Sequence, residues 1–187
     1  MRHAQSLANC EGLIVSRPEN GLLNYGLSKK GQLQVKDSAF KFIYTFDRKI
    51  QIISSDFKRA KETADVIHQS LRVTTAIKFD ERLRERDFGD FELHSDMHYQ
   101  TTWDNDAKDS SHTINNVESA DDVMTRVTKL IVDIEKEYSK STLLLVAHGD
   151  TLQILQTAFQ KQAATKQREL AHLENAEIRE LFLKNTD

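Results

Sequence analysis

Two histidines, two arginines and a glutamate have the side chains that could bind an anion and catalyse its reaction. Arg2 and His3 open the sequence, and Arg59, Glu85 and His148 follow at wide intervals. The segments that carry Arg59 and His148 each come after a strand-like run and before a helical pattern. Open α/β sheets place their sites at the carboxyl ends of the strands, where helix amino termini favour anions. These residue types therefore predict an anion-binding site at one edge of a sheet.

Each of these residues taken singly has an ordinary structural explanation. A histidine beside an arginine, such as His3, is usually part of a solvated surface pair, and Glu85 lies in a dense run of charges. His148 could be a hydrogen-bonded histidine at the end of a sheet. Arg59 is unfavourably placed for the dipole of the helix near whose start it lies, which hints at a nearby anion. The combination of residues and its order carry the prediction.

Hydrophobic periodicity predicts helices that alternate with strands. The predicted helices span residues 28–46, 56–71 and 119–138, and another begins near residue 151. The predicted strands span residues 50–53, 73–79, 142–147 and 178–183. The run 142–147 is apolar throughout, which predicts burial on both faces. On the first helix the candidates for the buried side are Leu33, Ala39, Phe40 and Ile43. The alternation predicts an α/β sandwich with a largely parallel sheet.

The composition is that of one ordinary globular domain. The chain has 187 residues, of which 39% are hydrophobic and 29% charged, and a net charge of -3. This charge gives no general attraction to nucleic acid, so an anionic ligand needs a local cluster of positive groups. No apolar run approaches the roughly 20 residues of a membrane span. The single Cys10 and the absence of a signal peptide predict a cytoplasmic protein. Oligomeric state is not readable from the sequence.

Six motifs in order resemble the histidine phosphatase superfamily, which includes phosphoglycerate mutases, over nearly the whole chain. The motifs are Arg2-His3-Ala4-Gln5-Ser6 with Asn9, Leu27-Ser28-Lys29-Lys30-Gly31-Gln32-Leu33-Gln34, Ser55-Asp56-Phe57-Lys58-Arg59-Ala60 followed by Thr63-Ala64, Leu83-Arg84-Glu85-Arg86-Asp87-Phe88-Gly89, Glu118-Ser119 with Asp122 and Arg126, and His148-Gly149. The resemblance implies a three-layer α/β/α sandwich around a mostly parallel sheet, phosphoglycerate mutase-like. It also implies a single domain over residues 1–187.

The resemblance also implies roles for the candidate residues. His3 would be the nucleophile that carries the phosphoryl group, and Glu85 would be the acid and then the base. Arg2, Arg59 and His148 would surround the phosphoryl oxygens, and Asn9 would add a neutral donor. The scheme needs no metal or other cofactor, and the predicted substrate is a small phosphorylated metabolite.

Two departures from the family pattern concern the first residues. Ala4 replaces a glycine, and we expect activity to survive if the backbone there does not need a positive φ. Only Met1 precedes Arg2, although the family places a central strand before its first histidine. A useful strand needs roughly five residues, so we expect that an upstream segment is missing from the sequence.

Residues 92–118 are predicted to form a lid over the site. This segment holds four aspartates and only one lysine or arginine, Lys108, which disfavours a polyanionic substrate. His94, His98 and His112 lie in it without a recognised metal-binding spacing, so no metal site is predicted. A phosphoglycerate mutase and a catalytically silent binding or regulatory domain stay open as alternatives to a phosphatase. A mutase of this type is typically longer and carries additional basic residues.

Overall fold

The computed structural model describes residues 1–42, 50–139 and 141–184. The sheet has the strand order β2 (Lys78–Phe79), β1 (Gln51–Ser54) and β3 (Leu143–Val146), and both pairings are parallel. The α-helices are α1 (Leu7–Glu11), α2 (Pro18–Gly21), α3 (Lys29–Phe42), α4 (Lys58–Ser70), α5 (His98–Asp106), α6 (Ala120–Glu137) and α7 (Gly149–Phe159). Short 3-10 turns span Glu81–Leu83, Gly89–Phe91, Ile114–Asn116 and Ala164–Glu169.

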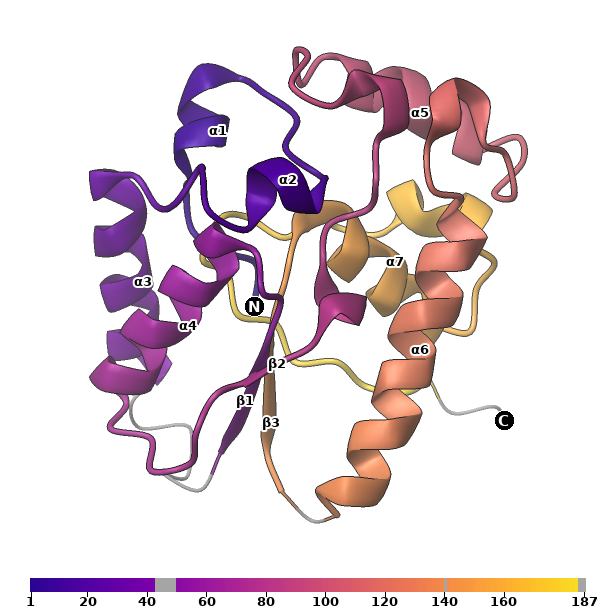
Figure 1. The fold of residues 1–187 in the computed structure, drawn as a ribbon. Helices are drawn as coiled ribbons and strands as arrows, with labels where there is room; N and C mark the ends of the chain where they lie inside the picture. The colour runs from indigo at the N-terminus through magenta and orange to yellow at the C-terminus, as the bar shows by residue number, and fades with distance from the viewer. Residues whose placement is uncertain (43–49, 140, 185–187) are drawn as a thin grey trace.

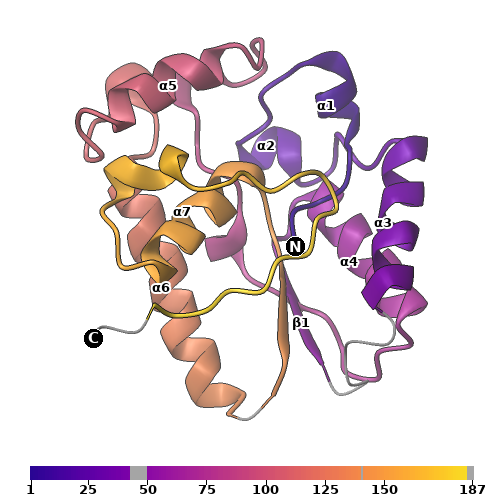
Figure 2. The same ribbon diagram turned by 180° about the vertical axis from the view of Figure 1, so that it is seen from behind.

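Helices cover both faces of the sheet, as Figures 1 and 2 show. On one face Ile52, Leu144 and Val146 pack against α3 and α4. On the other face Ile53 and Ala147 pack against α6 and α7. Alternate residues of one strand point to opposite faces, so the apolar runs of β1 and β3 supply both cores. The predicted three-layer α/β/α sandwich is confirmed.

Local sequence sets where the main helices begin. The hydroxyl of Ser28 accepts the Gly31 N–H at 3.0 Å before α3, and that of Ser119 accepts the Asp122 N–H at 3.0 Å before α6. Such caps satisfy amide groups that have no partner within the helix. Along α6 an apolar stripe is buried over the sheet, consisting of Val123, Val127, Leu130 and Ile134. The α6 prediction is therefore confirmed.

The buried face of α3 differs from the prediction. Leu33 and Phe40 are exposed, whereas Gly31, Val35 and Ala39 are buried, and Ile43 lies outside the described residues. The buried residues follow a spacing of four, which lays one narrow stripe against the neighbouring α4. Glycine is needed at position 31 because a Cβ there would lie 2.1 Å from the Gln5 carbonyl oxygen.

The chain's first residues extend the sheet beside β3. The Met1 amino group donates to the Leu145 carbonyl at 2.7 Å, and the Ala147 N–H donates to the Met1 carbonyl at 3.1 Å. The His3 N–H then donates to the Ala147 carbonyl at 2.9 Å, and Arg2 and Ala147 form a parallel bridge. The Met1 nitrogen thus occupies the position of an amide in a parallel ladder.

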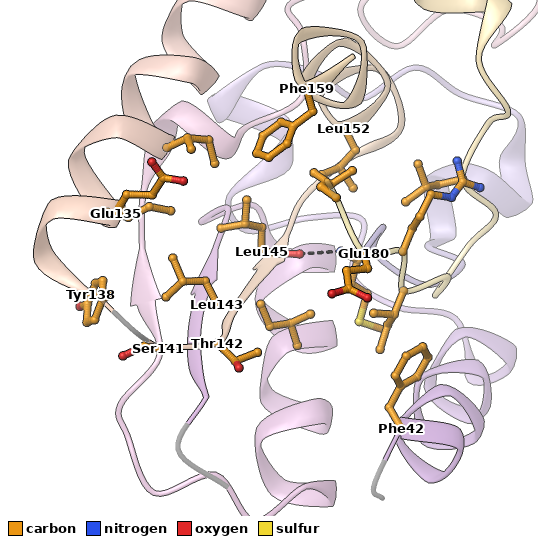
Figure 3. Close-up of a pocket in the computed structure, with 18 of the residues that line it drawn as sticks. Phe42, Glu135, Tyr138, Ser141, Thr142, Leu143, Leu145, Leu152, Phe159 and Glu180 are labelled. Atoms are coloured by element: carbon orange, nitrogen blue, oxygen red, sulfur yellow. Dashed lines mark hydrogen bonds between the residues drawn. The ribbon is translucent and has the colours of Figure 1, made fainter. Parts of the chain in front are cut away.

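A groove of about 610 Å³ continues along the same edge of β3 (Figure 3). Leu143 and Leu145 line one side, and Ile178 and Leu181 line another. A strand that continued the ladder backwards from Met1 would enter this groove. Leu143 and Leu145 are therefore only half-buried. Of the run 142–147 that was expected to be buried, Leu144, Val146 and Ala147 are buried.

The predicted last strand at 178–183 is wrong, because this segment has no strand structure. A strand needs a neighbouring backbone that exchanges hydrogen bonds with it. Among the described residues this segment pairs with no strand, and Ile178, Arg179, Glu180 and Leu181 line the groove. The strand predicted at 73–79 is likewise reduced to the two residues of β2.

Candidate active site

A polar cavity of about 200 Å³ lies at the carboxyl end of the sheet, where β1 and β3 end. Four of the five predicted catalytic residues line it: Arg2, His3, Arg59 and Glu85. Asn9 also lines it. The ring of His148 lies next to the ring of His3, with ring centroids 5.1 Å apart. The fold therefore brings together all the candidate residues, which come from four distant segments of the sequence.

His3 has one engaged and one chemically available ring nitrogen. Its Nδ1 lies 2.8 Å from the Ala4 carbonyl oxygen and must donate to it, so Nε2 carries the lone pair. Arg59 Nε donates to that Nε2 at 3.1 Å. Burial and then the charges of Arg59 and Arg2 hold the pKa of His3 well below its usual value. The ring is therefore neutral, as a nucleophile must be.

The backbone around His3 is held from several directions. The His3 carbonyl accepts from the Ala176 N–H at 3.3 Å and from Asn175 Nδ2 at 3.2 Å. The Ala4 N–H donates to the Thr63 hydroxyl at 3.2 Å. Ala4 is fully buried and is not among the residues with positive φ, so the alanine fits where the family has glycine.

Two arginines present donors that have no partner among the described residues. Arg59 Nη1 and Arg2 Nε are buried without a hydrogen bond. Other nitrogens hold the two guanidinium groups in place, since Arg59 Nη2 donates to the Val15 carbonyl at 2.8 Å and Arg2 Nη1 to the Leu173 carbonyl at 2.8 Å. A buried donor without a partner costs about 1–3 kcal/mol, and a bound oxyanion would supply the missing acceptor.

His148 lies at the N-cap position of α7 and is fully buried. Its Nε2 lies 2.8 Å from the Ser55 hydroxyl, while Nδ1 has no partner within the described chain. Burial, followed by the charge of Arg59, keeps the pKa of His148 well below its usual value, so the ring is neutral. The helix amino terminus adds a favourable field for an anion at this place.

The environment of Glu85 favours the protonated carboxyl group more than water does. It is buried, and burial followed by the nearby charge of Asp150 raises its pKa. Its Oε1 accepts from the Arg86 N–H at 3.1 Å, the Thr151 N–H at 3.3 Å and the Thr151 hydroxyl at 3.2 Å. These contacts fix the carboxyl through one oxygen and leave Oε2 as the atom that can exchange a proton.

The loop that carries Glu85 is tied down by a buried ion pair. Arg86 donates two hydrogen bonds to the Asp106 carboxylate at 2.6 and 2.8 Å and a third to the Glu118 carbonyl at 2.6 Å. Arg86 is fully buried, so the charged run around Glu85 is not a solvated face. Arg126 holds the Glu118 carboxylate in turn at 2.7 and 3.0 Å, which explains the Glu118 motif.

Asn9 is placed at the cavity through the short helix α1. Its Oδ1 accepts from the Ser6 N–H and hydroxyl at 3.0 Å each, in a reciprocal cap. The amide nitrogen is therefore the part of Asn9 that can donate to a ligand. The exposed position of Asn9 puts it at the cavity rim.

Residues 92–118 lie over the cavity and include α5. Asp96, Tyr99 and Trp103 of this segment line the cavity wall. Asp106, in contrast, is buried in the pair with Arg86 and contributes no charge to the cavity. The acidic character predicted for this cover is therefore reduced to Asp96 at the cavity itself.

Sequence reasoning missed a hydrogen-bonded network at the cavity wall, to which Trp103 and Asp150 belong. Trp103 Nε1 donates to both Asp150 oxygens at 3.1 Å, and Arg168 donates to the same carboxylate at 2.6 Å. The Arg168 guanidinium also stacks on the Trp103 ring at 3.3 Å. Asp150 directly follows the His148-Gly149 motif, which was the one available signal. Arg168 comes from a distant turn and had none.

In the described part of the chain, no group of three or more His, Cys, Asp or Glu side chains is placed to hold a metal ion. His94 and His98 have ring centroids 6.2 Å apart, and His98 stacks on Phe91. His112 instead bonds to Asp106 at 2.9 Å inside the core. No helix within the described ranges could cross a membrane.

Comparison with known proteins gives the family. Residues 1–186 match the histidine phosphatase superfamily (branch 1). A protein of Hydrogenobacter thermophilus named "Putative phosphoserine phosphatase 2" is 32% identical over 162 residues, which cover 81% of this chain and 72% of that protein. The chain therefore belongs to branch 1 of the histidine phosphatase superfamily. The prediction of a phosphatase of this superfamily is confirmed.

Solved structures of similar fold agree with this assignment. Mycobacterial glucosyl-3-phosphoglycerate phosphatase in complex with VO3 has a TM-score of 0.77 and 25% identity, covering 94% of this chain and 87% of its own. A structure titled "Mycobacterial hydrolase 1" has a TM-score of 0.75 and 26% identity, covering 94% and 83%. Bacillus stearothermophilus YhfR, at 22% identity and a TM-score of 0.76 over 94% and 85%, shows the same fold.

Proposed function

We propose that the protein hydrolyses a small phosphomonoester through a phosphohistidine at His3. The carrying observation is the neutral His3 ring, oriented by Ala4 and bordered by arginine donors without partners. An oxyanion in the cavity would take over the donors of Arg2 and Arg59 and release the lone pair of His3 Nε2. Positive groups placed in advance around the phosphoryl oxygens stabilise the transition state of transfer.

The chemistry follows in two displacements. In the first, His3 Nε2 attacks phosphorus, the ester P–O bond breaks, and Glu85 gives its proton to the leaving oxygen. In the second, water attacks phosphorus, Glu85 takes a proton from this water, and the P–N bond breaks to release phosphate. Each step returns Glu85 and His3 to the state that the next step needs. Arg2, Arg59, His148 and Asn9 would bind the phosphoryl oxygens throughout.

The lining of the cavity favours a phosphatase over a mutase. Arg2 and Arg59 are the lysine or arginine residues among the described residues that line the cavity, and both belong to the proposed phosphoryl site. A carboxylate or second phosphate on the leaving group would meet Asp96 instead. We therefore propose a leaving group without additional negative charge. The cytoplasmic location and the role of residues 92–118 as a lid stay predictions.

The substrates named for the relatives are candidates for the substrate of this protein. A phosphoserine phosphatase and a glucosyl-3-phosphoglycerate phosphatase both act on esters that carry a carboxylate, which the charge of Asp96 disfavours here. A screen of neutral, cationic and anionic phosphomonoesters would decide among these classes. The substrate with the highest kcat/KM gives the leaving group.

The mechanism is tested by trapping the intermediate. We expect hydrolysis of p-nitrophenyl phosphate in the presence of EDTA, and rapid quenching at alkaline pH followed by mass spectrometry should find phosphate on His3. His3→Ala should lower turnover about a thousandfold or more. His94→Ala is the matched control, because His94 is exposed and does not line the cavity. Undiminished turnover of the His3 variant would refute the proposal.

A further inference from the structure

Ser55 lies beside the catalytic cluster and has no role in the two displacements. It follows β1 directly, and its N–H donates to the Val146 carbonyl at 2.9 Å. Because Ser54 is in register with Val146, the position after β1 meets the residues that follow β3. His148 is two residues after Val146. The register of the sheet therefore places the Ser55 hydroxyl 2.8 Å from the His148 ring.

The hydrogen bond between these residues has two possible directions. A neutral imidazole carries its proton on one nitrogen only. If His148 Nε2 donated to Ser55, the Ser55 hydroxyl hydrogen would need an acceptor elsewhere. The hydroxyl oxygen already accepts from the Phe57 N–H at 3.3 Å, and no other acceptor for its hydrogen is found in the described residues. Ser55 is fully buried, so the unused donor would cost about 1–3 kcal/mol.

If Ser55 donates to His148 instead, the Ser55 hydroxyl and both His148 ring nitrogens all have partners once an oxyanion is bound. The Ser55 hydroxyl then donates to His148 Nε2, and the ring proton lies on Nδ1. Nδ1 is the buried nitrogen without a partner in the described chain. We infer that Ser55 is a positioning residue that fixes the Nδ1–H tautomer of His148, and so turns the ring into a neutral hydrogen-bond donor to the phosphoryl group. Its effect on rate rests on the function proposed above; its effect on the tautomer does not.

The tautomer can be read directly by nitrogen-15 NMR of the histidine side chains. In the wild-type protein at neutral pH we expect the His148 proton on Nδ1 and an unprotonated Nε2. Ser55→Ala should move the proton wholly or partly to Nε2. Ser55→Thr keeps the hydroxyl and should keep the Nδ1–H form. Ser54→Ala is the matched control, because Ser54 is equally buried and its hydroxyl donates to the Ser55 carbonyl at 2.8 Å.

The same variants report on phosphate. We expect Ser55→Ala to weaken binding of inorganic phosphate and to lower kcat/KM about tenfold, with Ser55→Thr near wild type. Ser54→Ala should stay within about twofold of wild type. A His148 proton on Nε2 in the wild-type protein would overturn the inference, and so would a tautomer that is unchanged in Ser55→Ala. If Ser55→Ala does not fold, the wild-type spectrum alone decides.

These measurements separate this inference from the proposed function. An Nδ1–H tautomer that depends on Ser55, in a protein without phosphatase activity, would refute the function and support the role of Ser55. Phosphatase activity with an Nε2–H tautomer would support the proposed function and refute the role of Ser55.

Discussion

The cavity at His3 and the groove beside β3 differ in both size and chemistry. The groove is the larger, at about 610 Å³ against about 200 Å³, and most of its lining is apolar. The cavity is bordered by Arg2 and Arg59, by Glu85, whose pKa is raised by burial, and by the His3 ring, whose Nε2 accepts from Arg59. Arg2 Nε and Arg59 Nη1 have no partner within the described residues. Of these two spaces, the cavity holds the residues proposed as nucleophile and acid together with unpartnered donors. The groups that line a space therefore decide its chemistry, and volume alone does not predict it.

His3 is held in place by hydrogen bonds that do not involve the groove. Backbone hydrogen bonds with Ala147 and Ala176, and one from the Asn175 side chain, hold His3 directly. The groove begins on the other side of Met1. We therefore expect changes in the cavity to act mainly on rate, and changes in the groove to act mainly on stability.

The largest effect on rate after loss of His3 is expected for Glu85→Gln. This variant keeps the shape of the side chain and removes its proton, so kcat should fall about 100-fold or more. The raised pKa of Glu85 means that the acid form persists to higher pH than for an ordinary glutamate, and wild-type activity should decline as pH rises through that pKa. The pH profile of kcat/KM should lose this basic limb in Glu85→Gln. An unchanged basic limb would assign it to another group.

Removing the buried ion pair should produce the largest loss of stability. Arg86→Met leaves the Asp106 carboxylate buried, with only His112 and Gln167 as remaining partners at 2.9 Å each. Breaking such a pair costs about 3–5 kcal/mol, measurable by urea unfolding. Arg17→Met is the control, because Arg17 and Asp87 form an ion pair whose side chains are 39% and 45% exposed. A surface pair of this kind contributes about 1 kcal/mol or less.

Filling the groove should raise stability with little effect on rate. We expect five β-branched apolar residues fused ahead of Met1 to raise Tm by about 5 °C. A Gly/Ser extension of equal length is the control. If kcat/KM rises as much as the stability does, the two regions are coupled and the comparison fails.

The same fusion should remove a pH dependence of stability. Burial lowers the pKa of the Met1 amino group to about 5, from 8.0. Between these values the unfolded chain binds a proton that the folded chain does not, so this group makes the protein less stable as pH falls from 8 to 5. An amide at this position has no such titration. Unfolding measured at pH 5 and pH 8, with and without the extension, would show the difference.

The smallest effect is expected for the charge of the cavity wall. Asp96→Lys should shift kcat/KM about tenfold from a cationic ester, such as phosphoethanolamine, toward an anionic one, such as a phosphoglycerate. Asp104→Lys makes the same charge change on the exposed side of α5, outside the cavity lining, and should leave the ratio unchanged. Equal ratios in both variants would remove Asp96 from substrate selection.

The motifs predicted the family, and the alternation of apolar runs with helical patterns predicted the α/β fold. Of the candidate site residues, Arg2, His3, Asn9, Arg59 and Glu85 line the cavity and His148 lies beside His3. This was possible because the family's motifs stand in a fixed order, and because the apolar runs of β1 and β3 and the periodicity of α4 and α6 are strong local signals. The buried side of α3 was not predictable in the same way. Ala39 is buried as predicted, but Leu33 and Phe40 are as apolar as Val35 and are exposed. The packing of Val35 and Ala39 in the core and the close approach of the Gln5 backbone to Gly31 are tertiary contacts that the local pattern does not reveal.

What the tertiary structure decided are the contacts between distant segments. The sequence supplied Ser55, Asp150 and Arg168 but gave no sign that they meet His148 and Trp103, because such contacts depend on strand register and on how a late turn folds back. The failure of residues 178–183 to form a strand has the same origin. A strand needs a neighbouring backbone that exchanges hydrogen bonds with it, and local sequence does not reveal whether such a neighbour is present.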